Sequence, residues 1–122
     1  MSTLSGLDFA ALQVRNLEAS ALFYEEMLGL KRAAYAPPHA IVFDTQPIPF
    51  AVREPVVDLD TMPQLGHGVA LWFLAEDSES LLTKLEEANV PIVQQIQQSP
   101  FGNTFMFRDP DGYIITVHDK AG

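Results

Sequence analysis

Residues 107–119 read FRDPDGYIITVHD, and this stretch decides the fold. Asp109-Pro110-Asp111-Gly112 has the composition of a tight turn, because proline presets the backbone at the second position and glycine suits the fourth. The runs TFMF before the turn and YIITV after it are apolar and have strand character. The stretch therefore predicts a β-hairpin that closes the chain.

Working back from this hairpin, the same order of elements, strand–helix–strand–strand–strand, occurs twice. The first series is predicted as strand 8–14, helix 17–28, a weaker strand 30–36, and strands 39–45 and 47–55. The second is strand 68–75, helix 76–88, strand 90–98 delayed by Pro91, and the hairpin strands 103–107 and 113–119. The segment 47–55 is bracketed by prolines, which favours a place near the edge of a sheet.

Both helices show an apolar stripe and start and stop signals. The predicted buried positions are Leu17, Ala21, Tyr24 and Leu28 in the first helix and Leu81, Leu82, Leu85 and Ala88 in the second. Asn16 is the predicted N-cap of the first helix and Gly29 its stop, and Asp77 or Ser78 caps the second.

The internal repeat of about 60 residues predicts two similar modules packed side by side. We expect one α+β domain over residues 1–122, with a βαβββ module at about 7–54, a connector at 55–67 and a second βαβββ module at about 68–119. Each module is expected to form a curved mixed sheet with its helix on the outer face. The inner face is then concave, and a ligand cleft is expected there.

The amino-acid composition disfavours several classes of function. The net charge is −9, from 16 acidic and 7 basic residues, which leaves no positive footprint for nucleic acid and disfavours an anionic membrane surface. The chain has no cysteine, which excludes disulfides and thiolate sites. The start, MSTLSGLDFAALQV, lacks the features of a signal peptide, and no apolar run is long enough to span a bilayer. A soluble cytoplasmic protein is expected.

The chain resembles the vicinal oxygen chelate superfamily, which includes glyoxalase I, extradiol dioxygenases, fosfomycin-resistance enzymes and bleomycin-binding proteins. The resemblance is carried by VRNLEASALFYEEMLGL (14–30), GVALWFLAEDSESLLTKLEEANVPI (68–92) and FGNTFMFRDPDGYIITV (101–117), in this order. It implies a glyoxalase/bleomycin-resistance fold over nearly the whole chain.

The resemblance also implies where a divalent metal is held in the superfamily's enzymes, and this chain departs from that pattern. The first ligand position, five residues before Val14, holds Phe9, and the second holds Val69 or Ala70 depending on register. The third, four residues past the turn glycine, holds Thr116. Phenylalanine, valine and alanine offer no lone pair and threonine is a weak neutral donor, so no metal and no cofactor is expected.

Histidine is the commonest protein metal ligand, so the three histidines are the candidates for a rebuilt metal site. His39, His67 and His118 are far apart in the sequence and form no closely spaced pair. Histidines on the surface or rim of the protein are the favoured interpretation.

An aromatic ring at Phe9 turns a coordination site into an apolar wall, on the same strand face as Ala11 and Gln13. The sequence therefore predicts a cleft that stacks a flat organic ligand, with Arg53, Thr116 and His118 as polar groups. The predicted aromatic lining is Phe9, Phe43, Phe50, Trp72, Phe105 and Phe107. The competing interpretation is that strand aromatics are core residues and that Arg53 pairs with a surface carboxylate. The face of Trp72 stays open, since one residue of register reverses it.

Superfamily members without the metal ligands look like bleomycin-resistance proteins, which are dimers that sequester a drug without transforming it. The leading hypothesis is therefore a metal-independent small-molecule-binding protein, with no catalytic residue, that sequesters a planar aromatic compound or antibiotic as a homodimer. The alternative is a lyase, isomerase or dioxygenase, using either a non-standard metal site of His67, His118 and a carboxylate, or Arg53 with a histidine and no metal. A third hypothesis is an interaction module whose cleft is filled by side chains.

Overall fold

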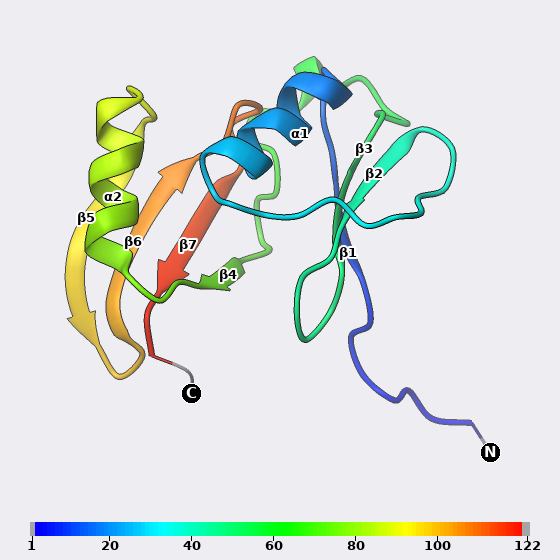
Figure 1. The fold of residues 1–122 in the computed structure, drawn as a ribbon. Helices are drawn as coiled ribbons and strands as arrows, with labels where there is room; N and C mark the ends of the chain where they lie inside the picture. Colours follow the sequence, from blue (N-terminus) through cyan, green and yellow to red (C-terminus); the bar gives the residue numbers. More distant parts are fainter. Residues whose placement is uncertain (1, 121–122) are drawn as a thin grey trace. The chain divides into compact units, whose positions relative to one another are not determined.

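The structure is a computed structural model that describes residues 2–120. The chain divides into two compact units, Met1–Thr61 and Met62–Gly122, and each is described by itself (Figure 1). The division lies inside the predicted connector, residues 55–67.

The first unit contains a three-stranded mixed sheet and one helix. Its elements are β1 (Ala10–Gln13), α1 (Leu17–Glu26), β2 (Ala40–Phe43), β3 (Phe50–Arg53) and a short 3-10 helix, η1 (Leu59–Thr61). The strand order is β1-β3-β2, with β1 parallel and β2 antiparallel to β3. The predicted weak strand at 30–36 is reduced to a single bridge between Arg32 and Phe43.

The second unit repeats this topology with a complete set of strands. Its elements are β4 (Leu71–Leu74), α2 (Ser78–Glu87), β5 (Ile92–Ser99), β6 (Gly102–Arg108) and β7 (Ile114–His118). The order is β4-β7-β6-β5, with β4 parallel to β7 and the other pairs antiparallel (Figure 1). Two α+β modules of the predicted type are confirmed, whereas the cleft stays a prediction.

The prediction for the strand at 47–55 is wrong. The prolines of this segment predict a strand near an edge, but β3, which lies within it, is the central strand of the first sheet, between β1 and β2. The reason is that Pro47, Pro49 and Pro55 all lie outside Phe50–Arg53, so the paired residues keep their N–H donors.

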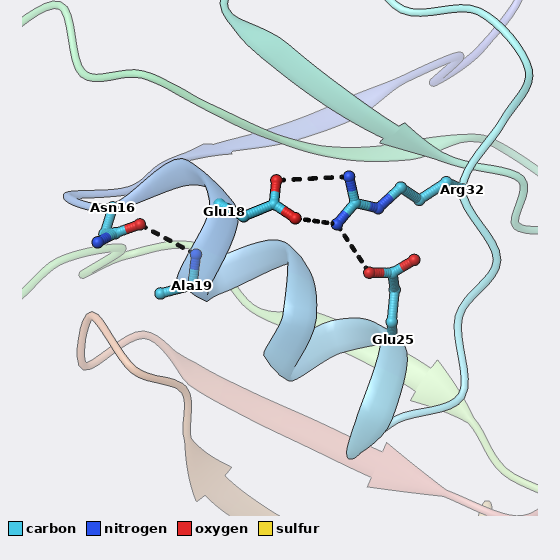
Figure 2. A network of polar contacts seen from close by, with 5 residues as sticks. All are labelled: Asn16, Glu18, Ala19, Glu25 and Arg32. Atoms are coloured by element: carbon cyan, nitrogen blue, oxygen red, sulfur yellow. Dashed lines mark hydrogen bonds and ion pairs between the residues drawn. The ribbon is translucent and has the colours of Figure 1, made fainter.

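The predicted helix starts are confirmed. The Asn16 side chain accepts a hydrogen bond from the Ala19 N–H at 3.0 Å (Figure 2), and Asp77, rather than Ser78, accepts from the Ser80 N–H at 3.0 Å. Each satisfies one N–H that the first helical turn leaves without an intrahelical acceptor. One predicted buried position is wrong, since Ala88 lies just past the end of α2 and is exposed.

A charged network ties α1 to the segment that follows it. The Arg32 guanidinium donates to Glu18 at 2.7 Å and to Glu25 at 2.9 Å, and Figure 2 shows the two carboxylates on the same side of the helix. These carboxylates raise the pKa of Arg32 above its ordinary value. The network stands at the surface, where such pairs contribute at most about 1 kcal/mol, so it orients the segment more than it stabilises the unit.

The helix-packed face of each sheet forms the core of its unit. In the first unit, the Tyr24 ring on α1 lies 5.1 Å from the Phe50 ring and 6.0 Å from the Phe43 ring, centroid to centroid. In the second, cross-strand partners on β6 and β7 share one face that is almost completely buried. These residues are Phe105, Phe107, Ile115 and Val117. Among residues 2–120, no helix is long and apolar enough to cross a membrane.

Candidate functional site

The second sheet carries its candidate binding residues on the face opposite its core. Pairing of β4 with β7 places Trp72 beside Thr116 and Leu74 beside His118. Because side chains alternate along a strand, these four residues share the face that α2 does not cover. Thr116 is nevertheless buried there, at 4% exposed, so its hydroxyl is not accessible as the polar contact that the sequence predicts. The register therefore settles the orientation of Trp72, which lies on the open face and is 47% exposed.

Three rings on this face form an aromatic cluster, defined as Trp72, Phe101 and His118. The ring centroid of Trp72 lies 5.6 Å from that of Phe101 and 5.7 Å from that of His118, and Phe101 and His118 are 6.2 Å apart. All three contacts are edge-to-face, with interplanar angles between 64° and 83°. Trp72 and Phe101 remain 47% and 42% exposed in this arrangement, so part of each residue is accessible to a flat molecule.

Phe101 belongs to the turn between β5 and β6 and was missed in the sequence. Its signal was the segment SPFG (99–102), where an aromatic residue stands in a tight turn and the turn leaves it 42% exposed. An apolar ring at a turn has no strand face to bury it, so it was a candidate for a binding surface.

Asp119 holds this turn against the end of β7. Its carboxylate accepts hydrogen bonds from the Ser78 hydroxyl and from the Asn103 N–H, each at 2.8 Å. These two donors keep the pKa of Asp119 below its ordinary value. The Lys120 N–H also donates to the Phe101 carbonyl at 3.0 Å. Residues from three elements thus fix the position of Phe101 beside His118.

The hydrogen-bond partner of the His118 ring indicates which ring nitrogen is the donor. Nδ1 lies 3.1 Å from the Lys120 carbonyl oxygen, which can only accept a hydrogen bond. Nδ1 is therefore the donor of this hydrogen bond, and in the tautomer with a single proton on Nδ1 the other ring nitrogen, Nε2, is an acceptor.

Four predicted ligand-binding residues lie elsewhere. Phe43 and Phe50 pack against Tyr24 of α1, and Phe105 and Phe107 are buried on the helix-covered face of the second sheet. Each is at most 4% exposed, so their assignment to the ligand-binding face is corrected to core.

Phe9 and Arg53 belong to the first unit. Phe9 immediately precedes β1 and is 45% exposed. Arg53 is half-buried, lies opposite Gln13 in the sheet, and donates from Nε to the Glu54 carbonyl at 3.0 Å. A contact of either residue with a ligand stays a prediction.

The positions that hold a metal in the related enzymes do not fit one here. Val69 and Ala70 both precede β4 and are both exposed, and neither side chain offers a donor atom. With Phe9 at the first position, only the Thr116 hydroxyl remains as a donor, and it is a weak one.

The histidines do not replace the missing ligands. His39 pairs with Glu54 in the first unit, His67 is exposed between the helix η1 and strand β4, and His118 belongs to the aromatic cluster. Within residues 2–120, no group of three or more histidine, aspartate or glutamate side chains is arranged to hold a metal ion.

Comparisons with known proteins agree on one superfamily. A profile of the Glyoxalase/Bleomycin resistance protein/Dioxygenase superfamily matches residues 6–117. The phenazine antibiotic resistance protein EhpR of Enterobacter agglomerans is 28% identical over 112 residues, which are 85% of this chain and 84% of that protein.

Solved structures share the fold. Lactoylglutathione lyase from Agrobacterium tumefaciens superposes with a TM-score of 0.68 at 21% identity, covering 97% of this chain and 96% of the lyase. The fosfomycin resistance protein FosX from Listeria monocytogenes gives 0.74 at 14% identity, covering 98% of this chain and 94% of FosX. At these identities the likeness concerns the fold alone.

Proposed function

Because the chain belongs to the Glyoxalase/Bleomycin resistance protein/Dioxygenase superfamily, we propose that it binds a small planar aromatic molecule without a divalent metal. The observation that carries the proposal is the aromatic cluster on the open face of the second sheet. Two of its three rings are more than 40% exposed although both are large and apolar.

An exposed cluster of this kind binds flat molecules for a simple reason. A planar ligand that stacks on one of the two exposed rings, Trp72 or Phe101, and borders the other removes apolar surface from water on both partners, which is favourable by about 25 cal/mol per Å². Ring–ring geometry adds about 0.5–1.5 kcal/mol per pair. Turn and strand already hold the rings in place, so little side-chain freedom is lost on binding.

The similarity to EhpR gives the ligand a chemical class. That protein is described as conferring resistance to phenazine antibiotics. Phenazine is a flat ring system, and its shape suits the aromatic cluster. The sequence similarity to EhpR therefore supports the sequestration of a planar antibiotic as the function of this chain.

Metal independence is proposed from the residues at the superfamily's ligand positions. Phe9 and either Val69 or Ala70 supply no donor atom, and Thr116 supplies a neutral hydroxyl. Binding is therefore expected to depend on shape and stacking, so that it survives treatment with a chelator.

The test uses a natural reporter. Trp72 is the only tryptophan in the chain, so its fluorescence reports on the aromatic cluster alone. Phenazine is titrated into protein dialysed against EDTA, and saturable quenching is expected. Phe101→Ala is expected to weaken binding about 3- to 10-fold, since it removes one ring partner. Tyr35→Ala is the matched control, because Tyr35 is an aromatic that is 80% exposed in the first unit.

Two results would overturn the proposal. One is the absence of quenching and of thermal stabilisation across a panel of planar aromatic compounds. The other is one tightly held divalent metal per chain, found by elemental analysis of protein purified without chelator. The superfamily includes lyases and dioxygenases, and a bound metal would move this chain into that enzymatic group.

The proposal extends to a cytoplasmic homodimer, which is the assembly expected from the resemblance to bleomycin-binding proteins. Light scattering coupled to size-exclusion chromatography measures this directly. A mass near twice 13.5 kDa is expected, and a single-chain mass would remove the dimer from the proposal while leaving ligand binding intact.

A further inference from the structure

We infer that the ligand is a planar aromatic that donates a hydrogen bond from its rim to Nε2 of His118. This inference rests on the proposed function and narrows it to one class: flat compounds bearing an amino, hydroxyl or ring N–H group.

The first step is the state of the His118 ring. The Lys120 carbonyl accepts a hydrogen bond from Nδ1 at 3.1 Å, which assigns the proton of the neutral imidazole to that nitrogen. The lone pair of Nε2 then lies on the other side of the ring, directed away from the Lys120 backbone. Since Lys120 is itself tied to Phe101 at 3.0 Å, the tautomer is held by the same contacts that place the cluster.

The second step is the position of this acceptor. The His118 ring lies 5.7 Å from the Trp72 ring and 6.2 Å from the Phe101 ring, centroid to centroid, at interplanar angles of 64° and 83°. A flat molecule that stacks on either of these rings is therefore steeply inclined to the imidazole and does not stack on it face to face. A hydrogen bond at the rim is in the plane of the ligand, where amino and hydroxyl substituents project.

The third step is the polarity of the surroundings. Leu74, the partner of His118 on β4, is apolar and 59% exposed. Thr104, its partner on β6, is buried, and its hydroxyl is hydrogen-bonded to Ser99 Oγ at 2.8 Å. Neither Leu74 nor Thr104 is therefore available to hydrogen-bond a polar substituent on the rim of the ligand. Of these three residues, His118 is the one that can make this contact. A ligand polar atom placed there needs a hydrogen, because Nε2 offers a lone pair.

The experiment compares two ligands of nearly equal size, 2-aminophenazine and 2-methylphenazine, by calorimetry and Trp72 quenching. The first carries a donor at its rim and the second does not. The native protein is expected to bind 2-aminophenazine about 5- to 10-fold more tightly. His118→Phe keeps an aromatic ring without the acceptor, so it is expected to abolish the preference for 2-aminophenazine over 2-methylphenazine, measured as the ratio of the two dissociation constants.

The outcomes separate the two proposals. If both ligands bind the native protein equally, or if His118→Phe keeps the preference, the inference is wrong and the proposed function stands. If neither ligand binds, the proposed function fails as well. The comparison of the two ligands on native protein decides the matter even if His118→Phe does not fold.

Discussion

Gly102 is the glycine on which the turn beside the aromatic cluster depends. Its φ is +84°, a conformation that side-chain-bearing residues rarely adopt. A Cβ built at this position would meet a carboxylate oxygen of Asp119 at 2.1 Å and Lys120 Cβ at 3.0 Å. Gly102→Ala must therefore displace the side chain that holds the turn against β7.

The expected cost has two parts. The left-handed conformation costs about 1–2 kcal/mol for alanine. Forcing a methyl group into occupied space adds about 1–3 kcal/mol. Gly112→Ala is the matched control, because Gly112 has a φ of +97° and nothing within 4 Å of its added Cβ. The control is thus expected to lose about 1–2 kcal/mol of unfolding free energy, and Gly102→Ala about 2–5 kcal/mol.

Urea unfolding followed by Trp72 fluorescence measures both variants, because the only tryptophan lies in the same unit as the two glycines. Gly102→Ala is also expected to change the native emission of Trp72, since the turn carries its neighbour Phe101. Asp119→Ala removes the nearest clashing atom, so most of the excess cost of Gly102→Ala should disappear in that background. Equal losses for the two glycine variants would refute the assigned role of Asp119.

Three further predictions concern the core, a helix cap and acid stability. Phe43→Leu should cost about 1–2 kcal/mol in urea unfolding and leave phenazine affinity unchanged, and a tenfold loss of affinity would contradict the core assignment. Asn16→Ala should cost about 1 kcal/mol, whereas Asn16→Asp should keep the cap and the stability. Asp119 has a pKa lowered from 3.8, so its stabilisation is complete above the unfolded-state pKa and is lost as pH falls through the lowered value. Thermal melts below about pH 4 should therefore show a shallower pH dependence for Asp119→Asn than for native protein, and parallel curves would contradict this assignment.

The sequence carried the fold because its signals are local. Turn residues, helix caps and the two-fold order of elements all act within a few residues, and Asn16 and Asp77 cap the helices as predicted. The edge prediction for β3 failed because the prolines flank the paired residues without occupying a paired position. Whether a proline occupies a paired position depends on the residue at which strand pairing begins, and the composition of the segment does not reveal that residue.

The site was harder to predict because a strand face depends on register. Phe105 and Phe107 alternate with Met106 in the sequence, but only the pairing with β7 shows that the phenylalanines share the buried face of Val117. The sheet face of Trp72 is ambiguous in the sequence for the same reason, and its pairing with Thr116 determines that face. Phe101 was not predicted as a binding residue, because a residue in a turn is not part of the alternating pattern of a strand.

A crystal structure with bound phenazine tests the central claim most directly. We expect the ligand to lie against the indole of Trp72, with its rim at His118 and with no metal ion between ligand and protein. A phenazine bound away from Trp72, or one held through a metal ion, would contradict it.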